Sequence, residues 1–99
     1  MSDYKYTCVD RFLEYVKIDT QSDPESTSFP STEKQKNLAI VLVDELQALG
    51  LSDAAMDENG YVFATLPGNT DADVPTIGLI SHLDTSPDVS GKNINTMLH

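Results

Sequence analysis

The chain contains very little cysteine: Cys8 is the only one, and tryptophan is absent. A single cysteine excludes an internal disulfide and a zinc site built from several thiolates. The place of Cys8 on a predicted helix face favours a small buried apolar side chain over a nucleophile.

Basic residues are also scarce, with 6 Lys and Arg against 16 Asp and Glu and a net charge of −10. Nucleic-acid and anionic-membrane binders need clustered Lys and Arg, so we expect neither partner. No run of about 18 consecutive apolar residues is present, which predicts no membrane span. The first 30 residues lack a basic segment followed by an apolar run, so we expect no signal peptide and a cytoplasmic location.

A chain of 99 residues forms at most one small domain. Its first apolar pattern predicts a helix over residues 4–17, because the apolar side chains recur at the i, i+3, i+4, i+7 spacing. We expect Ser2 or Asp3 to cap its start. The apolar positions of this stripe are Val9, Phe12, Leu13 and Val16.

Residues 19–31 form a polar, proline-containing stretch in which Phe29 is the only apolar anchor. Proline and hydroxyl residues at this density predict an irregular loop. Loops of this length are often functional, and a solvated surface loop is the alternative.

The second helix is predicted over residues 32–49. Thr32 and Gln35 have the spacing of a capping box, and Gly50 suits a left-handed C-terminal cap. Its wide apolar stripe consists of Leu38, Ala39, Leu42, Val43, Leu46 and Leu49.

Three strands are predicted after this helix. Residues 54–57 and 61–66 read as a hairpin, because residues 58–60 are Glu-Asn-Gly, a tight-turn signature. Residues 76–81 are nearly all apolar without alternation, which is typical of a strand covered on both faces. We therefore predict an α/β fold with two helices, a hairpin and one buried central strand in an incomplete sheet. Expressed alone, such a chain should expose an apolar sheet edge.

His82 and Asp84 follow the predicted central strand directly. Ligands in open α/β sheets commonly sit at the carboxyl ends of strands, and a carboxylate beside a histidine fixes its tautomer for metal binding. This pattern favours His82 as a zinc ligand and Asp84 as its orienting partner, with a structural core histidine as the alternative. His99 is a poor candidate for a further ligand. Three carboxylates lack any spacing that supports a ligand role: Asp57, Glu58 and Asp88.

Four segments together resemble the peptidase T family of tripeptide aminopeptidases. This family belongs to the two-zinc exopeptidases, which also include carboxypeptidase G. The resemblance runs over almost the whole chain from about residue 8, in the correct order. The segments are 15–22 (YVKIDTQS), 29–35 (FPSTEKQ), 57–67 (DENGYVFATLP) and 82–93 (HLDTSPDVSGKN).

The resemblance implies that residues 1–99 are the N-terminal part of a zinc peptidase catalytic domain, without its lid and dimerisation domain. It implies that His82 binds one of two zinc ions and that Asp84, a catalytic residue, orients it. Leu83 stands where close relatives are expected to have Met, a volume-conserving change. The remaining ligands and a glutamate general base would lie beyond His99.

The implied activity is hydrolysis of the N-terminal peptide bond of a tripeptide, by an enzyme that forms a homodimer when full-length. We expect the 99 residues alone to be inactive, because only one metal ligand is among them. The alternative is a non-catalytic folding or assembly fragment in which His82 is structural only.

Overall fold

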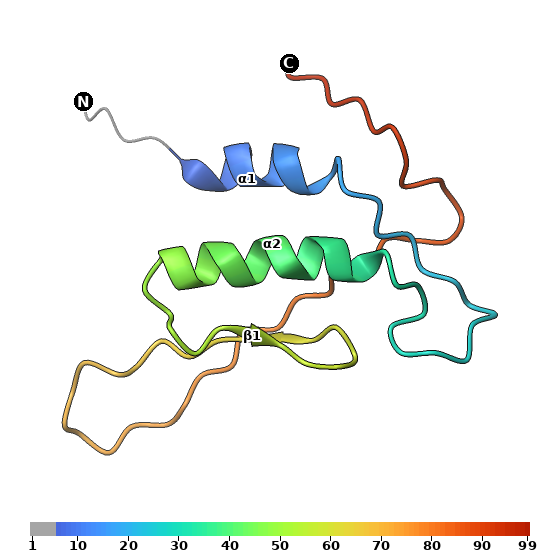
Figure 1. Cartoon of the computed structure of the whole chain (residues 1–99). Helices are drawn as coiled ribbons and strands as arrows, with labels where there is room; N and C mark the ends of the chain where they lie inside the picture. The colour runs from blue at the N-terminus through green and yellow to red at the C-terminus, as the bar shows by residue number, and fades with distance from the viewer. Residues whose placement is uncertain (1–5) are drawn as a thin grey trace.

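The computed structural model describes residues 6–99, and the proposed caps Ser2 and Asp3 lie outside this range. In Figure 1, α1 lies beside α2, and the hairpin packs against α2 on the side away from α1. No helix in the described part is long and apolar enough to cross a membrane. The elements are α1 (Thr7–Tyr15), α2 (Gln35–Ala48), β1 (Ala55–Met56) and β2 (Val62–Phe63).

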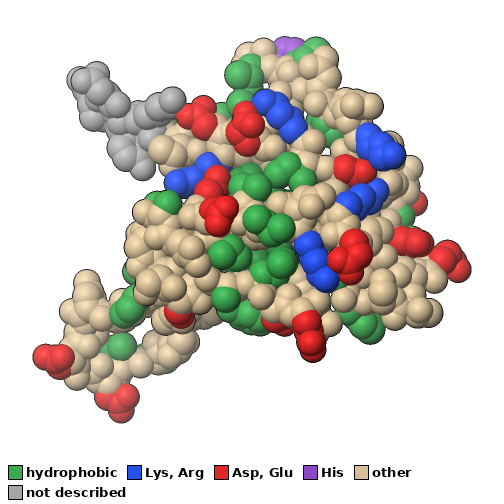
Figure 2. All heavy atoms as spheres, viewed as in Figure 1, with side chains coloured by type: hydrophobic (Ala, Val, Ile, Leu, Met, Phe, Trp, Pro, Cys, Tyr) green, Lys and Arg blue, Asp and Glu red, His purple; other side chains and the backbone are tan. Residues whose placement is uncertain are grey.

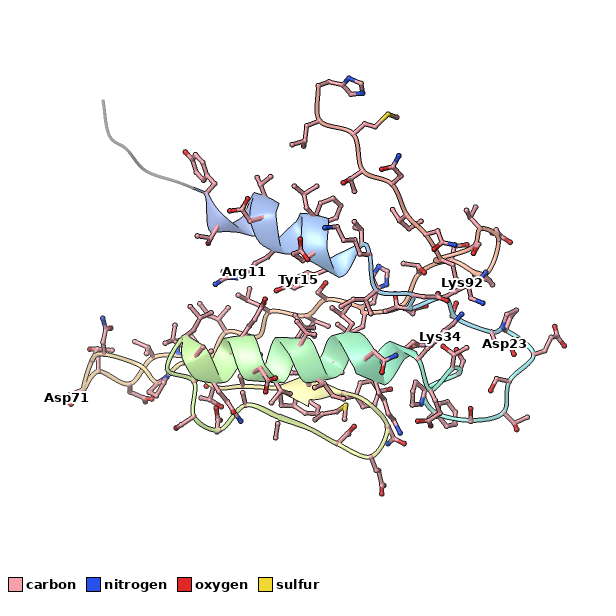
Figure 3. All side chains as sticks on the ribbon, turned by 45° about the horizontal axis from the view of Figure 1, so that its top comes forward. Arg11, Tyr15, Asp23, Lys34, Asp71 and Lys92 are labelled. Carbon is pink, nitrogen blue, oxygen red and sulfur yellow. The ribbon has the colours of Figure 1, made fainter. Side chains whose placement is uncertain are left out.

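Helix α1 is shorter than the predicted 4–17, and none of its residues is buried. The prediction that Cys8 is buried is wrong: the residue lies in the first turn of a helix that has no buried residue, and it is exposed. The helix is joined to α2 further along, through the side chains of Arg11 and Tyr15. Figure 3 shows Arg11 and Tyr15 projecting from α1 toward α2, where both side chains meet Glu45.

Helix α2 begins at Gln35, and its N-cap Lys34 makes no side-chain capping bond. The predicted capping box does not form with backbone amides: the Thr32 hydroxyl donates to the Gln21 carbonyl, 2.8 Å away, and accepts from the side-chain amide of Gln35 at 3.0 Å. The C-terminal prediction is confirmed: Gly50 has φ of +98°, a left-handed conformation that glycine adopts without strain.

The predicted hairpin is confirmed in a shorter form. Strands β1 and β2 pair antiparallel, with Ala55 opposite Phe63 and Met56 opposite Val62. The Asp57 carboxylate accepts the amide of Tyr61 at 2.8 Å and so fixes the turn. This two-stranded sheet packs on α2, which makes the chain a small mixed α/β structure with an incomplete sheet.

The buried central strand predicted at 76–81 is wrong. Residues 76–81 have no strand structure, and Ile77, Leu79 and Ile80 are 83%, 95% and 99% exposed. A central strand needs a hydrogen-bonded neighbour on each edge and packing on each face. The described part of the chain provides neither, so the apolar segment stays extended in solvent.

The buried core is therefore small. Five residues of the described chain are buried: Thr20, Leu38, Ala39, Ala54 and Gly91. The radius of gyration is 16.3 Å, against about 13 Å for a compact chain of 100 residues. Figure 2 shows apolar side chains gathered in the middle of one face, over α2. Much of the apolar surface thus remains uncovered.

Candidate functional site

His82 and Asp84 are in direct contact. The His82 Nδ1 lies 3.0 Å from the Asp84 Oδ1. An ionised carboxylate only accepts hydrogen bonds, so the neutral imidazole must carry its proton on Nδ1 and donate it to Asp84. This leaves the lone pair of Nε2 available to a metal ion. The side chain of His82 is 83% exposed, so nothing in the described chain covers it.

The residue after Asp84 is fixed to the loop that follows α1. The amide of Thr85 donates to the Thr20 carbonyl at 3.0 Å, and the Thr85 carbonyl accepts the amide of Ser22 at 3.0 Å. These bonds form a parallel bridge between Gln21 and Thr85. In Figure 1 the orange segment before residue 85 passes behind α2 and meets the blue loop after α1. Thr20, 2% exposed, is the buried centre of this crossing.

Gln21 extends the bridge with its side chain. Its amide nitrogen donates to the carbonyls of Pro87 at 2.9 Å and Val89 at 3.1 Å. Its backbone is fixed as well, by the Asp19 carboxylate at 3.1 Å and the Thr32 hydroxyl at 2.8 Å. Gln21 therefore connects the loop after α1 to the turn that follows the His82–Asp84 pair.

Asp19 supports this connection. Its carboxylate accepts a hydrogen bond from Lys34 Nζ at 2.9 Å. This bond, together with the amide of Gln21, lowers the pKa of Asp19 below its ordinary value. Figure 3 shows Lys34, just before α2, and Lys92 on the same side of the molecule. A Cβ added at Gly91 would lie 2.5 Å from Asp19 Oδ1, so a larger residue at this position would displace the Asp19 carboxylate.

The segment that carries His82 and Asp84 lies between two hollows. The first, of about 510 Å³, contains both side chains and the aromatic residues Phe29, Tyr61 and Phe63. The second, of about 560 Å³, lies between the same segment and α1, with Phe12 in its lining. Both hollows are open to solvent, which leaves space beside the His82 ring.

The other candidate ligands do not join the pair. Within residues 6–99, no group of three or more His, Cys, Asp or Glu side chains is placed to hold a metal ion. Asp57 serves the hairpin turn instead. The sequence pattern missed the connection through Asp19 and Gln21, although both lie in the segment 15–22 that carries the family resemblance.

The sequence of the chain is similar to those of several peptidase T proteins. The chain is 63% identical over 92 residues to peptidase T of Alkaliphilus oremlandii (strain OhILAs), covering 91% of the chain and 22% of that relative. It is 55% identical over 94 residues to peptidase T of Geobacillus thermodenitrificans (strain NG80-2), covering 95% and 23%. It is 54% identical over 94 residues to peptidase T of Bacillus subtilis (strain 168), again covering 95% of the chain and 23% of that relative.

The resemblance to the peptidase T family is confirmed. The chain spans less than a quarter of the length of these peptidase T relatives. No protein-family model matches it.

Proposed function

We propose that this chain is the N-terminal part of the catalytic domain of a zinc-dependent tripeptide aminopeptidase, located in the cytoplasm. The similarity to peptidase T over almost the whole chain supports the peptidase assignment. The contact between His82 and Asp84 carries the proposed roles of these residues. In this proposal, a lid and dimerisation domain lie outside residues 1–99 and the full-length enzyme is a homodimer.

The donor chemistry of the pair fits zinc. A histidine that donates its other ring proton to a carboxylate is the usual form of a zinc-bound imidazole. His82 would hold one zinc ion through Nε2, and a second zinc ion would have its ligands elsewhere in the enzyme. Bound zinc lowers the pKa of a water molecule and stabilises negative charge on the substrate carbonyl oxygen.

Asp84 acts on the ring rather than on the substrate in this proposal. By accepting the Nδ1 proton at 3.0 Å, its carboxylate fixes the tautomer and increases the basicity of Nε2. The exposure of His82 leaves room for the remaining ligands and for a peptide.

The 99 residues alone should be inactive. A four-coordinate catalytic zinc needs three protein ligands, and the described residues offer one. Calorimetric zinc titration of the 99-residue polypeptide should show weak binding. Tight binding of two equivalents, or tripeptide hydrolysis at the full-length rate, would contradict this part of the proposal.

The central test is tripeptide hydrolysis by the full-length protein carrying His82→Gln. We expect activity to fall by about 100-fold or more, because loss of a ligand's hydrogen-bonding partner alone typically costs about 10–100-fold. His99→Gln is the matched control and should retain activity. If His82→Gln hydrolyses tripeptides normally, His82 is a structural histidine and the assigned role is wrong.

A further inference from the structure

The His82–Asp84 pair is anchored from one side only. Before it, Leu79 and Ile80 are 95% and 99% exposed and make no backbone hydrogen bond in the described part of the chain. After it, Thr85 is bonded through both its amide and its carbonyl to the loop that follows α1. The position of the pair therefore depends on whatever keeps Thr85 and the following turn in place.

Gln21 is the residue that joins these parts. Its backbone lies opposite Thr85 in the bridge, and its side-chain amide bonds to two carbonyls of the following turn, those of Pro87 and Val89. Two bonds from one amide to two carbonyls of the turn fix the turn in both position and orientation. A turn that is free to move would carry Asp84 away from the ring of His82.

Gln21 is itself restrained, which allows it to act as a rigid connector. Its backbone amide donates a hydrogen bond to the Asp19 carboxylate, and its backbone carbonyl accepts one from the Thr32 hydroxyl. The Asp19 carboxylate is bonded in turn to Lys34 at the start of α2. The absence of a side chain at Gly91 lets the chain just after the 85–89 turn pack directly against Asp19. The restraint thus leads from α2 through Gln21 to the turn.

We propose that Gln21 is a positioning residue that keeps Asp84 against the His82 ring by holding the 85–89 turn. This inference rests on the proposed function for its consequence in catalysis, but the contact itself can be measured without activity. The bonds of Gln21 go to Thr85, Pro87 and Val89 rather than to His82 or Asp84, so its effect passes through the backbone of the 85–89 turn.

The test uses the full-length protein, metal-free, with histidine labelled by 15N. Long-range 15N–1H spectra should show His82 as the Nδ1–H tautomer in the unchanged protein. In Gln21→Ala and in the isosteric Gln21→Glu, which lacks the amide donors, His82 should shift toward the Nε2–H tautomer of a free imidazole. Retention of the Nδ1–H tautomer in both variants, or its absence in the unchanged protein, would overturn the proposal.

Gln47→Ala is the matched control, because the side-chain amide of Gln47, in the last turn of α2, also donates to a backbone carbonyl, that of Ala54 at 3.0 Å. It should leave the tautomer unchanged. In tripeptide hydrolysis, Gln21→Ala should lower kcat about tenfold with KM unchanged, since a small misplacement of a reacting group costs rate rather than binding. If His82→Gln keeps full activity the proposed function fails, whereas if only Gln21→Ala keeps it the positioning role fails.

Discussion

Lys34 Nζ lies 2.9 Å from Asp19 Oδ2, and this ion pair joins the start of α2 to the loop that carries Gln21. The Lys34 side chain, followed by the Gln21 amide, lowers the pKa of Asp19 in the folded protein. An acid with a lowered folded pKa stabilises the fold above its unfolded pKa and loses that contribution as the pH falls through the folded value.

We therefore expect Asp19→Asn to lower the urea midpoint of the full-length protein at pH 7. The difference in urea midpoint between the variant and the unchanged protein should shrink as the pH falls below 3.8, the ordinary pKa of Asp19. Asp44→Asn is the control, because the Asp44 side chain has no bond to any described residue, and it should show no gap at either pH. A gap for Asp19→Asn that persists unchanged to pH 3 would show that the ion pair does not stabilise the fold.

The close packing of Gly91 against the Asp19 carboxylate can also be tested. In Gly91→Ala the new Cβ would lie 2.5 Å from Asp19 Oδ1, so the carboxylate must move and weaken its bond to Lys34. We expect a loss of about 1–3 kcal/mol in the free energy of unfolding, as for an overpacked site.

The control is Gly68→Ala, because a Cβ at Gly68 meets nothing within 4 Å. Its effect on the free energy of unfolding should stay within about 0.5 kcal/mol. A double-mutant cycle should show that Gly91→Ala costs less when Asp19 is replaced by Ala, because the clashing carboxylate is then absent. Additive effects of the two substitutions would contradict the close approach.

Tyr15 fastens α1 to α2 through its hydrogen bond to Glu45. Burial, followed by the bond and the charge of Glu45, raises the pKa of Tyr15 to about 12. Because the unfolded chain releases this proton first, near 10.0, stability present below that pH should be lost between 10 and 12. Absorbance titration at the phenolate band should show one late tyrosine that disappears in Tyr15→Phe. Tyr61→Phe should retain it, and loss of the late step in Tyr61→Phe would refute the assignment.

The elements with local signals could be predicted from the sequence. The glycine after α2 and the Asn-Gly turn depend on backbone conformations that neighbouring residues specify, so Gly50 and Gly60 both have the expected positive φ. The strand at 76–81 could not be decided locally, because an apolar run becomes a strand only when other strands pair with it.

The sequence likewise predicted the local contact in the candidate site but not the long-range one. The two-residue spacing of His82 and Asp84 predicted that they share one side, and they are in contact. The connection through Gln21 spans 66 residues to Pro87, and no periodic pattern records a contact of that length. Thr32 shows a competing long-range contact: its hydroxyl accepts from the nearby Gln35 side chain but donates its proton to the carbonyl of the distant Gln21.

The exposed segment 77–80 predicts the behaviour of the 99-residue polypeptide in isolation. Contiguous apolar surface in water promotes association, so this polypeptide should bind the dye ANS and self-associate with rising concentration in sedimentation experiments. Leu79→Lys together with Ile80→Lys should reduce both effects, because these side chains are 95% and 99% exposed. Leu49→Lys, at the exposed C-cap of α2, is the control. Equal reduction by Leu49→Lys would mean that no particular segment drives association.

The substitution Asp84→Asn distinguishes two effects of the Asp84 carboxylate on His82, namely its hydrogen bond to the ring and its negative charge. The amide keeps the shape of the carboxylate and can still accept a hydrogen bond from Nδ1, but it lacks the negative charge that increases the basicity of Nε2. We expect zinc affinity and tripeptide hydrolysis by the full-length protein to fall about 10–100-fold, with a larger loss in Asp84→Ala.

Asp88→Asn is the matched control, because Asp88 lies in the same turn but bonds to Ser86 rather than to His82. It should leave zinc affinity within twofold of the unchanged protein, a change of about 0.4 kcal/mol or less. If Asp84→Asn and Asp88→Asn behave alike, the carboxylate at residue 84 contributes only to the general negative charge of this surface. A loss confined to Asp84→Asn and Asp84→Ala instead assigns the effect to residue 84, whose carboxylate bonds to the His82 ring, whereas that of Asp88 bonds to Ser86.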